Sequence, residues 1–180
     1  MKIAIDISQL AYANTGVANY LGHLVAGMIA KDKENEYILF YSSLRQNLNN
    51  TFFNISELPR NITIQRFRFP PRVLDFLWNK MHIFPIEWLI GNVDIFISSD
   101  WTEPPSLHAK KITILYDLVV YKHPEESAEI IVQTQKRKLK WVKKETAKIL
   151  CISEATRKDA QELLGISDNK LQVIYPGLTI

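Results

Sequence analysis

Short runs of consecutive apolar residues alternate with helical patterns from one end of this chain to the other, and this alternation restricts the fold more than any other feature. The runs are apolar at neighbouring positions, so the strands that they predict are expected to be covered on both faces. Such strands, when they alternate with helices, are typical of a parallel sheet between two layers of helices. The sequence therefore predicts an α/β fold with three layers, α/β/α, and a mostly parallel sheet.

The expected elements follow from apolar periodicity and from the residues that end each pattern. Strands are expected at residues 2–7, 36–41, 62–67, 94–98, 111–115, 149–152 and 171–174. Helices are expected at residues 17–31, 125–147 and 156–164, and Gly165 is the expected C-cap of the last one. The Asn-rich residues 46–54 predict a flexible surface loop.

Size and composition indicate one globular domain. The chain has 180 residues, 47% hydrophobic and 23% charged, which suits a single core. Its first apolar run is too short for a secretory signal. Polar residues interrupt the stretch 73–91, whereas a membrane span needs about 20 nearly uncharged residues. The lone Cys151 lies in an apolar strand, which predicts a buried, inert thiol and fits a reducing cytoplasm.

Ligands of parallel α/β sheets bind at the carboxyl ends of the strands. This rule directs attention to the loops after residues 7, 98, 115 and 152. The first of these loops ends in Thr15-Gly16 and opens a helix, whose free backbone N–H groups are suited to a phosphate. The alternative is that Thr15 is a plain N-cap, because no complete phosphate-binding motif is present.

Two further strand ends carry polar and aromatic side chains. Asp100 and Trp101 follow two serines and are suited to bind sugar hydroxyls and to stack on a sugar ring. They are equally suited to form a turn and to pack on the core. Tyr116 and Asp117 end the next strand, where the carboxylate is placed either to contact a ligand or to form a turn.

The helix predicted at 125–147 carries a basic stretch. The cations that form its candidate contact surface are Lys136, Arg137, Lys140 and Lys144. Such a surface suits an anionic membrane, although a solvated helix face explains it as well. Nucleic acid is not expected as a partner, because the basic residues lack interleaved aromatic side chains beyond Trp141. The four histidines show no metal-ligand spacing, so no metal is expected.

Taken in order, three segments resemble the pattern of the family-four retaining glycosyltransferases. The first is MKIAIDISQLAYANTGVANYLGHLVAGM, in which Asp6, Thr15, Gly16 and Tyr20 stand in matching places. The second is ITILYDLVVYKHPE, which resembles that family's strand and its H-D-L motif. The third is LCISEATRKDAQELLGISDNKLQVIYPGL, which resembles its S-E-x-[ST]-[RK]-x-[DE] helix before the interdomain linker.

The resemblance implies the Rossmann-like N-terminal domain of a GT-B enzyme, in which this domain binds the acceptor. The donor-binding C-terminal domain is expected to be absent from residues 1–180. The donor implied is a GDP- or UDP-linked sugar, transferred with retention and without a metal or other cofactor. The acceptor implied is a saccharide or a lipid-linked molecule.

Residue roles are carried over from the same match. Asp117 and Tyr116 are the implied catalytic candidates. Tyr116 replaces the family's usual His and is assigned a positioning role, because a phenol is a poor proton acceptor near neutral pH. The implied substrate-binding residues are Gly16, Thr15, Tyr20, Asp100, Trp101, Ser153 and Thr156.

The sequence thus predicts the acceptor domain of a glycosyltransferase that moves a mannose-like hexose. Without the donor half, residues 1–180 are expected to be inactive alone, because stabilisation of charge on the leaving group is usually the largest catalytic effect. The expected location is the cytoplasm, peripheral to the inner membrane face. The alternative is a non-catalytic Rossmann-like module that binds a nucleotide or a protein partner.

Overall fold

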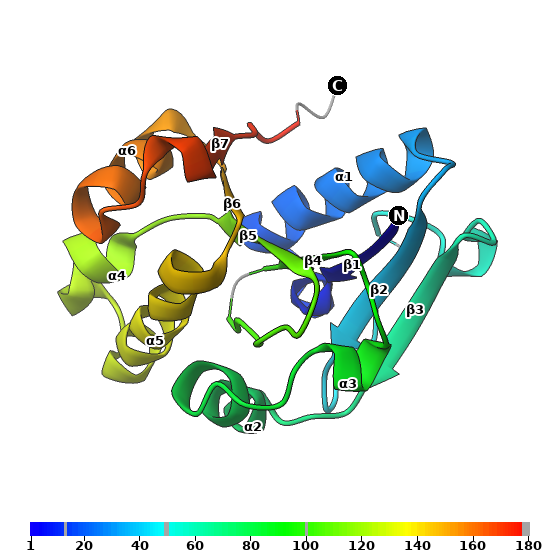
Figure 1. Ribbon diagram of the computed structural model, residues 1–180, viewed down its shortest axis with the longest axis horizontal. Coiled ribbons are helices and arrows are strands. Elements are labelled where there is room, and N and C mark those ends of the chain that lie inside the picture. The colour runs from blue at the N-terminus through cyan, green and yellow to red at the C-terminus, as the bar shows by residue number, and fades with distance from the viewer. Residues whose placement is uncertain (13, 49–50, 100, 178–180) are drawn as a thin grey trace.

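The computed structural model describes residues 1–12, 14–48, 51–99 and 101–177. These residues form a seven-stranded sheet in the order β3-β2-β1-β4-β5-β6-β7, and every neighbouring pair is parallel (Figure 1). The strands are β1 (Lys2–Asp6), β2 (Glu36–Ser42), β3 (Ile62–Phe67), β4 (Ile95–Ser98), β5 (Lys110–Leu115), β6 (Lys148–Cys151) and β7 (Leu171–Val173). The α/β fold with a parallel sheet is therefore confirmed, and each expected strand is present within one or two residues at either end.

Helices connect the strands. They are α1 (Gly16–Lys31), α2 (Pro71–Leu74), α3 (Glu87–Ile90), α4 (Val119–Lys122), α5 (Glu129–Glu145) and α6 (Glu154–Leu164). A π-helical segment, η3 (Asp75–Lys80), continues directly from α2. Short 3-10 turns are η1 (Ser8–Ala11), η2 (Ile55–Glu57), η4 (Pro124–Glu126) and η5 (Asp168–Lys170).

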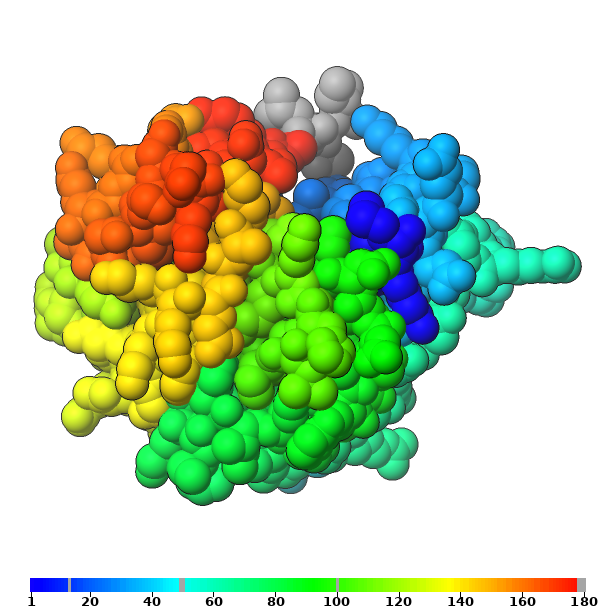
Figure 2. Space-filling model, in the orientation of Figure 1, coloured from blue at the N-terminus to red at the C-terminus, as the bar shows by residue number. Residues whose placement is uncertain are grey.

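The two faces of the sheet are covered by different helices. Helix α1 lies on one face, and α2, α3 and α5 lie on the other (Figure 1). Alternate residues of the strands supply the two cores, so that Ile5 packs with α1 while Phe40 packs against Trp78 of η3. A third cluster joins α5 and α6, whose yellow and orange surfaces adjoin in Figure 2. This separation explains why the strands are apolar at neighbouring positions.

Several expectations need correction. Helix α5 begins at Glu129 rather than at residue 125, because Pro124 opens a 3-10 turn that ends in an extended Ser127. In the Asn-rich segment, Phe52 is partly buried against the core beside Gly22 of α1, so the segment is not simply a surface loop.

The predicted end of α6 is confirmed, because Gly165 has φ of 61° and caps that helix. No helix in the described part of the chain is long and apolar enough to cross a membrane.

The strand order contains one topological switch. The chain runs outward from β1 to β2 and β3, and then crosses back to place β4 on the other side of β1. Loops that leave β1 and β4 at their carboxyl ends therefore diverge, and the space between them is where ligands of such sheets bind.

Candidate functional site

A cavity of about 560 Å³ opens at the carboxyl edge of the sheet, beside this switch. Asp6 and Ser42, the last residues of β1 and β2, line its base. Residues of η1 and the start of α1 line one side, while α2 and the first turns of α5 line two others. Trp101 and Thr102, which follow β4, complete it. The volume lies within the range of small-molecule sites.

Asp6 is the buried acidic group of the cavity. Its side chain is 7% exposed, and Oδ1 accepts a hydrogen bond of 2.9 Å from the backbone N–H of Ser8. Burial raises the pKa of the Asp6 carboxyl, although the hydrogen bonds from Ser8 and the charge of Lys138 act in the opposite direction. A carboxyl held in this way, next to an open cavity, is suited to hydrogen-bond a ligand hydroxyl.

Lys138 places a buried positive charge next to this acid. It projects from α5, is 2% exposed, and its Nζ donates a hydrogen bond to the backbone carbonyl of Ser99 at the end of β4. Lys138 belongs to the basic stretch of α5 but not to the contact surface predicted from the sequence, and its inward position was not predicted. Its spacing of four from Thr134 and from Val142, both buried, was the available signal for an inward position.

Asn79 fixes the backbone that carries Trp101. Asn79 is 2% exposed, and its Nδ2 donates to the carbonyl of Trp101 (2.9 Å) and to Asp75 Oδ1 (2.9 Å). Its Oδ1 accepts from the backbone N–H of Glu103 (3.0 Å). One buried amide thus ties the loop after β4 to η3, so the indole is held at the cavity by a rigid support.

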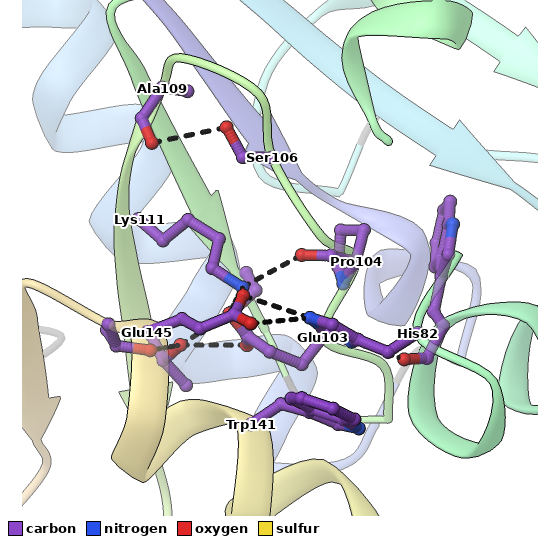
Figure 3. Close-up of polar contacts among 12 residues, drawn as sticks. His82, Glu103, Pro104, Ser106, Ala109, Lys111, Trp141 and Glu145 are labelled. Atoms are coloured by element: carbon purple, nitrogen blue, oxygen red, sulfur yellow. Dashed lines mark hydrogen bonds and ion pairs between the residues drawn. The ribbon is translucent and has the colours of Figure 1, made fainter. Parts of the chain in front are cut away.

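A buried polar network anchors the rest of that loop. Glu103 is fully buried, and its Oε2 accepts hydrogen bonds from Ser98 (2.5 Å) and Thr113 (2.9 Å). Lys111 Nζ lies 3.2 Å from Glu103 Oε1 and donates to Glu145 Oε2 (2.9 Å), as Figure 3 shows.

His82 extends this network. Its Nε2 lies 2.9 Å from Glu145, and its ring stacks on Trp141 with centroids 3.6 Å apart. Burial by itself would raise the pKa of Glu145. The hydrogen bonds and charges of Lys111 and His82 outweigh burial, so the pKa is lowered overall. The network does not line the cavity; it fixes the loop that does.

The structure divides the residues predicted from the sequence into two groups. Thr15 and Trp101 line the cavity. Thr15 also caps α1, since its Oγ1 accepts from the backbone N–H of Ala18 (3.1 Å), and Gly16 is the first residue of that helix. Asp100 lies outside the described residues.

The second group, which lies at the ends of β5 and β6 together with Tyr20 of α1, does not line the cavity. Tyr116 and Tyr20 are both 7% exposed and meet edge to face with centroids 5.7 Å apart. Asp117 is exposed, and its Oδ1 accepts from the N–H of Val119 (3.1 Å), as in the turn alternative.

Three hydrogen bonds tie this group together. Ser99 Oγ lies 3.0 Å from the Tyr116 hydroxyl, and Thr156 Oγ1 donates to the Tyr116 carbonyl (3.1 Å). Ser153 caps α6 through the N–H of Thr156 (3.1 Å). Ser99 therefore connects this group to the loop that carries Trp101.

Among the residues that the structure describes, one group of side chains has a spacing compatible with a cation. It consists of His123, Glu125 and Glu126, whose ligand atoms lie within 4.8 Å of one another. All three are exposed and none lines the cavity, so this surface cluster has no evident connection to the site.

Comparisons with known proteins agree with this fold and with the motifs. The model of the family described as Glycosyltransferase Family 4 matches residues 14–180, and this match confirms the family predicted from the sequence. No curated protein matches the chain in sequence.

Solved structures of UGT2 from Phytolacca americana share the fold. The apo structure has a TM-score of 0.55 at 10% identity, and the complex with UDP-2fluoro-glucose and pterostilbene has a TM-score of 0.52 at 11% identity. Each match covers 98% of this chain and 52% of the UGT2 chain, so the present chain spans about half the length of those structures. The likeness confirms the Rossmann-like fold of a GT-B glycosyltransferase domain.

Proposed function

This chain belongs to Glycosyltransferase Family 4, and we propose that it is the acceptor-binding domain of a retaining glycosyltransferase. The enzyme transfers a hexose, mannose-like in our proposal, from a GDP- or UDP-linked donor to a saccharide or lipid-linked acceptor. Residues 1–180 alone bind the acceptor without catalysing transfer. The donor is bound mainly by a second domain outside these residues.

The observation that supports this proposal is the cavity beside the switch between β1 and β4. It combines a buried carboxyl at Asp6, which accepts from the backbone N–H of Ser8, with an indole at Trp101, whose backbone carbonyl accepts from the buried Asn79. A carboxyl that accepts from hydroxyls and a flat apolar ring are the groups that sugar-like ligands require.

We place Asp117 and Tyr116 nearer the donor than the acceptor. Asp117 is exposed at the same carboxyl edge as the cavity, while Tyr116 is buried beneath it. In this proposal Asp117 contacts the donor sugar, and Tyr116 positions the strand end through Ser99 and Thr156.

The proposed location is the cytoplasmic face of a membrane. Lys136, Lys140 and Lys144 are exposed on α5, where they also lie over the rings of Tyr121 and Trp141 at 5.1–5.4 Å. Arg137 differs, because its Nη2 pairs with Asp75 at 2.7 Å within the fold. The three lysines therefore form the surface that we propose for anionic lipid, each cation contributing about 1 kcal/mol.

The test is transfer of labelled hexose by the complete product of the reading frame that encodes this chain. GDP-mannose and UDP-glucose are supplied with a lipid and glycan extract, and residues 1–180 are assayed in parallel. We expect transfer by the complete product, at least tenfold slower in Asp6→Asn, and none by residues 1–180. No transfer from any nucleotide sugar would refute the proposal and favour the non-catalytic binding module, which predicts binding alone.

A further inference from the structure

We propose that the cavity takes an amphiphilic acceptor, with an apolar chain or ring system between α2 and α5 and an anionic group held by Arg72. This inference rests on the proposed function and specifies the chemistry of the acceptor. It follows from the uneven distribution of polar and apolar groups around the cavity.

Most of the side chains that α2 and α5 place at the cavity are apolar. Ile130 and Ile131 at the start of α5 are 63% and 36% exposed, and Leu74 of α2 and the ring of Phe69 line the cavity with them. Isoleucines exposed to this degree beside a cavity are unfavourable in water unless a ligand covers them. A purely polar saccharide would leave them hydrated, whereas an alkyl, prenyl or aryl group would bury them.

A group of polar side chains lies at the base of the cavity, at the ends of β1 and β4 and in the turn η1. Asp6, Ser8, Gln9 and Thr102 lie there, and Asp6, Gln9 and Thr102 are themselves buried. A ligand hydroxyl placed at this end meets hydrogen-bond partners, and the rest of the ligand then runs along the helix walls toward solvent. The cavity therefore favours a molecule with a hydrogen-bonding group at the base and an apolar body along the helix walls.

The charge at the outer wall indicates an anion. Arg72 of α2 is exposed at the cavity, and within the described part of the chain its guanidinium makes no hydrogen bond or ion pair. The neighbouring Asp75 is already occupied, because Oδ2 accepts from Arg137 (2.7 Å) and Oδ1 accepts from Asn79 (2.9 Å). Arg72 is thus free to form the bidentate contact that guanidinium makes with phosphate or carboxylate.

Four probes test the apolar body and the anionic group of the ligand separately. They are octyl phosphate, octyl glucoside, inorganic phosphate and maltotriose, each titrated into residues 1–180 by calorimetry below the concentration at which micelles form. Quenching of indole fluorescence, which is lost in Trp101→Phe, locates the bound probe at the cavity. We expect octyl phosphate to bind more tightly than octyl glucoside, and neither inorganic phosphate nor maltotriose to bind measurably.

Matched variants assign the contacts. Arg72→Gln should weaken octyl phosphate by about tenfold and leave octyl glucoside unchanged, since a charged hydrogen bond is lost. The control Arg60→Gln, an exposed arginine beside the amino ends of the strands, should change neither. Ile130→Asn should weaken both octyl probes by about fivefold. Leu163→Asn, on an exposed position of α6, should weaken neither.

If octyl phosphate and octyl glucoside bind with equal affinity, and Arg72→Gln changes neither affinity, the proposal that Arg72 holds an anionic group is overturned. Binding of maltotriose at Trp101 without octyl phosphate would overturn the whole inference and leave the proposed function standing. If no probe binds but the complete product transfers hexose, the inference alone fails. If transfer is also absent, the proposed function fails with it.

Discussion

Replacing Lys111 by Met should cost far more stability than the loss of one surface charge. Lys111 is 3% exposed, and its ammonium donates to the carbonyl of Pro104 (2.9 Å) and to Glu145 Oε2 (2.9 Å). It also pairs with Oε1 of the fully buried Glu103 at 3.2 Å, in a geometry that is not that of a hydrogen bond. The buried ammonium thus makes two hydrogen bonds and one ion pair.

The magnitude follows from what Lys111→Met leaves behind. Methionine fills a similar volume, but the Glu103 carboxylate then lies buried without a cation, which costs about 3–5 kcal/mol. Total stability of a domain is about 5–15 kcal/mol, so the loss is large. With a urea slope of about 2 kcal/mol/M, the midpoint of unfolding should fall by about 1.5–2.5 M.

Urea titration followed by circular dichroism measures this shift, and Lys158→Met is the matched control. Lys158 pairs with Glu162 at 3.7 Å on exposed α6, where such a pair contributes about 0.5 kcal/mol or less. The double variant Glu103→Met and Lys111→Met should lose less than the sum of its single variants, because no unpaired charge remains. If Lys111→Met unfolds at the same urea concentration as Lys158→Met, the reasoning is refuted.

Three further outcomes are expected. Gly22→Ala should lower the free energy of unfolding by about 1–3 kcal/mol, because its Cβ would lie 2.3 Å from a phenylalanine ring. Gly27→Ala on the same helix, with no atom within 4 Å, should raise it by about 0.5–1 kcal/mol; thermal unfolding of both variants compares them. Burial by itself would raise the pKa of Glu87, but hydrogen bonds from a serine and from backbone N–H groups outweigh it, so the pKa is lowered overall. The pKa of Glu145 is lowered by its partners in the same way. Both groups therefore stabilise the fold above their unfolded pKa of about 4.3, and stability measured by urea at pH 6, 4 and 3 should fall through that window, less steeply in Glu87→Gln. Burial raises the pKa of Cys151 to about 11, so iodoacetamide at pH 8 should modify it only in urea; rapid labelling of the native chain would contradict this.

The sheet was predictable from the sequence because its strands are buried on both faces. Ile38 and Leu39 of β2, for example, lie on opposite faces and belong to different cores, and both are apolar. Their run of apolar residues therefore marks the strand without reference to any distant contact. The end of α6 was equally local, since a glycine in the left-handed conformation stops a helix by itself.

The segment between β3 and β4 was not predictable in the same way. Its helices α2 and α3 have four residues each, and α2 continues directly into the π-helical η3, so no regular period emerges. Trp78 is fully buried there, while Phe76 two residues earlier is 48% exposed. Which aromatic faces the core depends on the packing against the sheet, and local sequence does not encode it.

The candidate site was predictable in its position, and Thr15 and Trp101 among its members were predicted, but the residues that the helices contribute were not. Residues of the loops after β1 and β4 line the cavity at the carboxyl edge, as the rule for parallel sheets requires. Arg72 and Ile130 reach the same cavity from helices that lie far apart in the sequence, and neither belongs to a motif. Their contribution depends on how α2 and α5 pack across the face of the sheet, which is a tertiary property.

We expect stability and ligand binding to be coupled in this domain through one short loop. Trp101 and Thr102 line the cavity, and the next residue, Glu103, belongs to the buried network. A change at Lys111 that lets water reach Glu103 therefore also releases the backbone that Asn79 holds beside the indole. Because an unpaired buried charge is relieved most easily by local unfolding, the loop after β4 is expected to open before the sheet does. Buried polar residues that contact no ligand would then determine how well the cavity is formed.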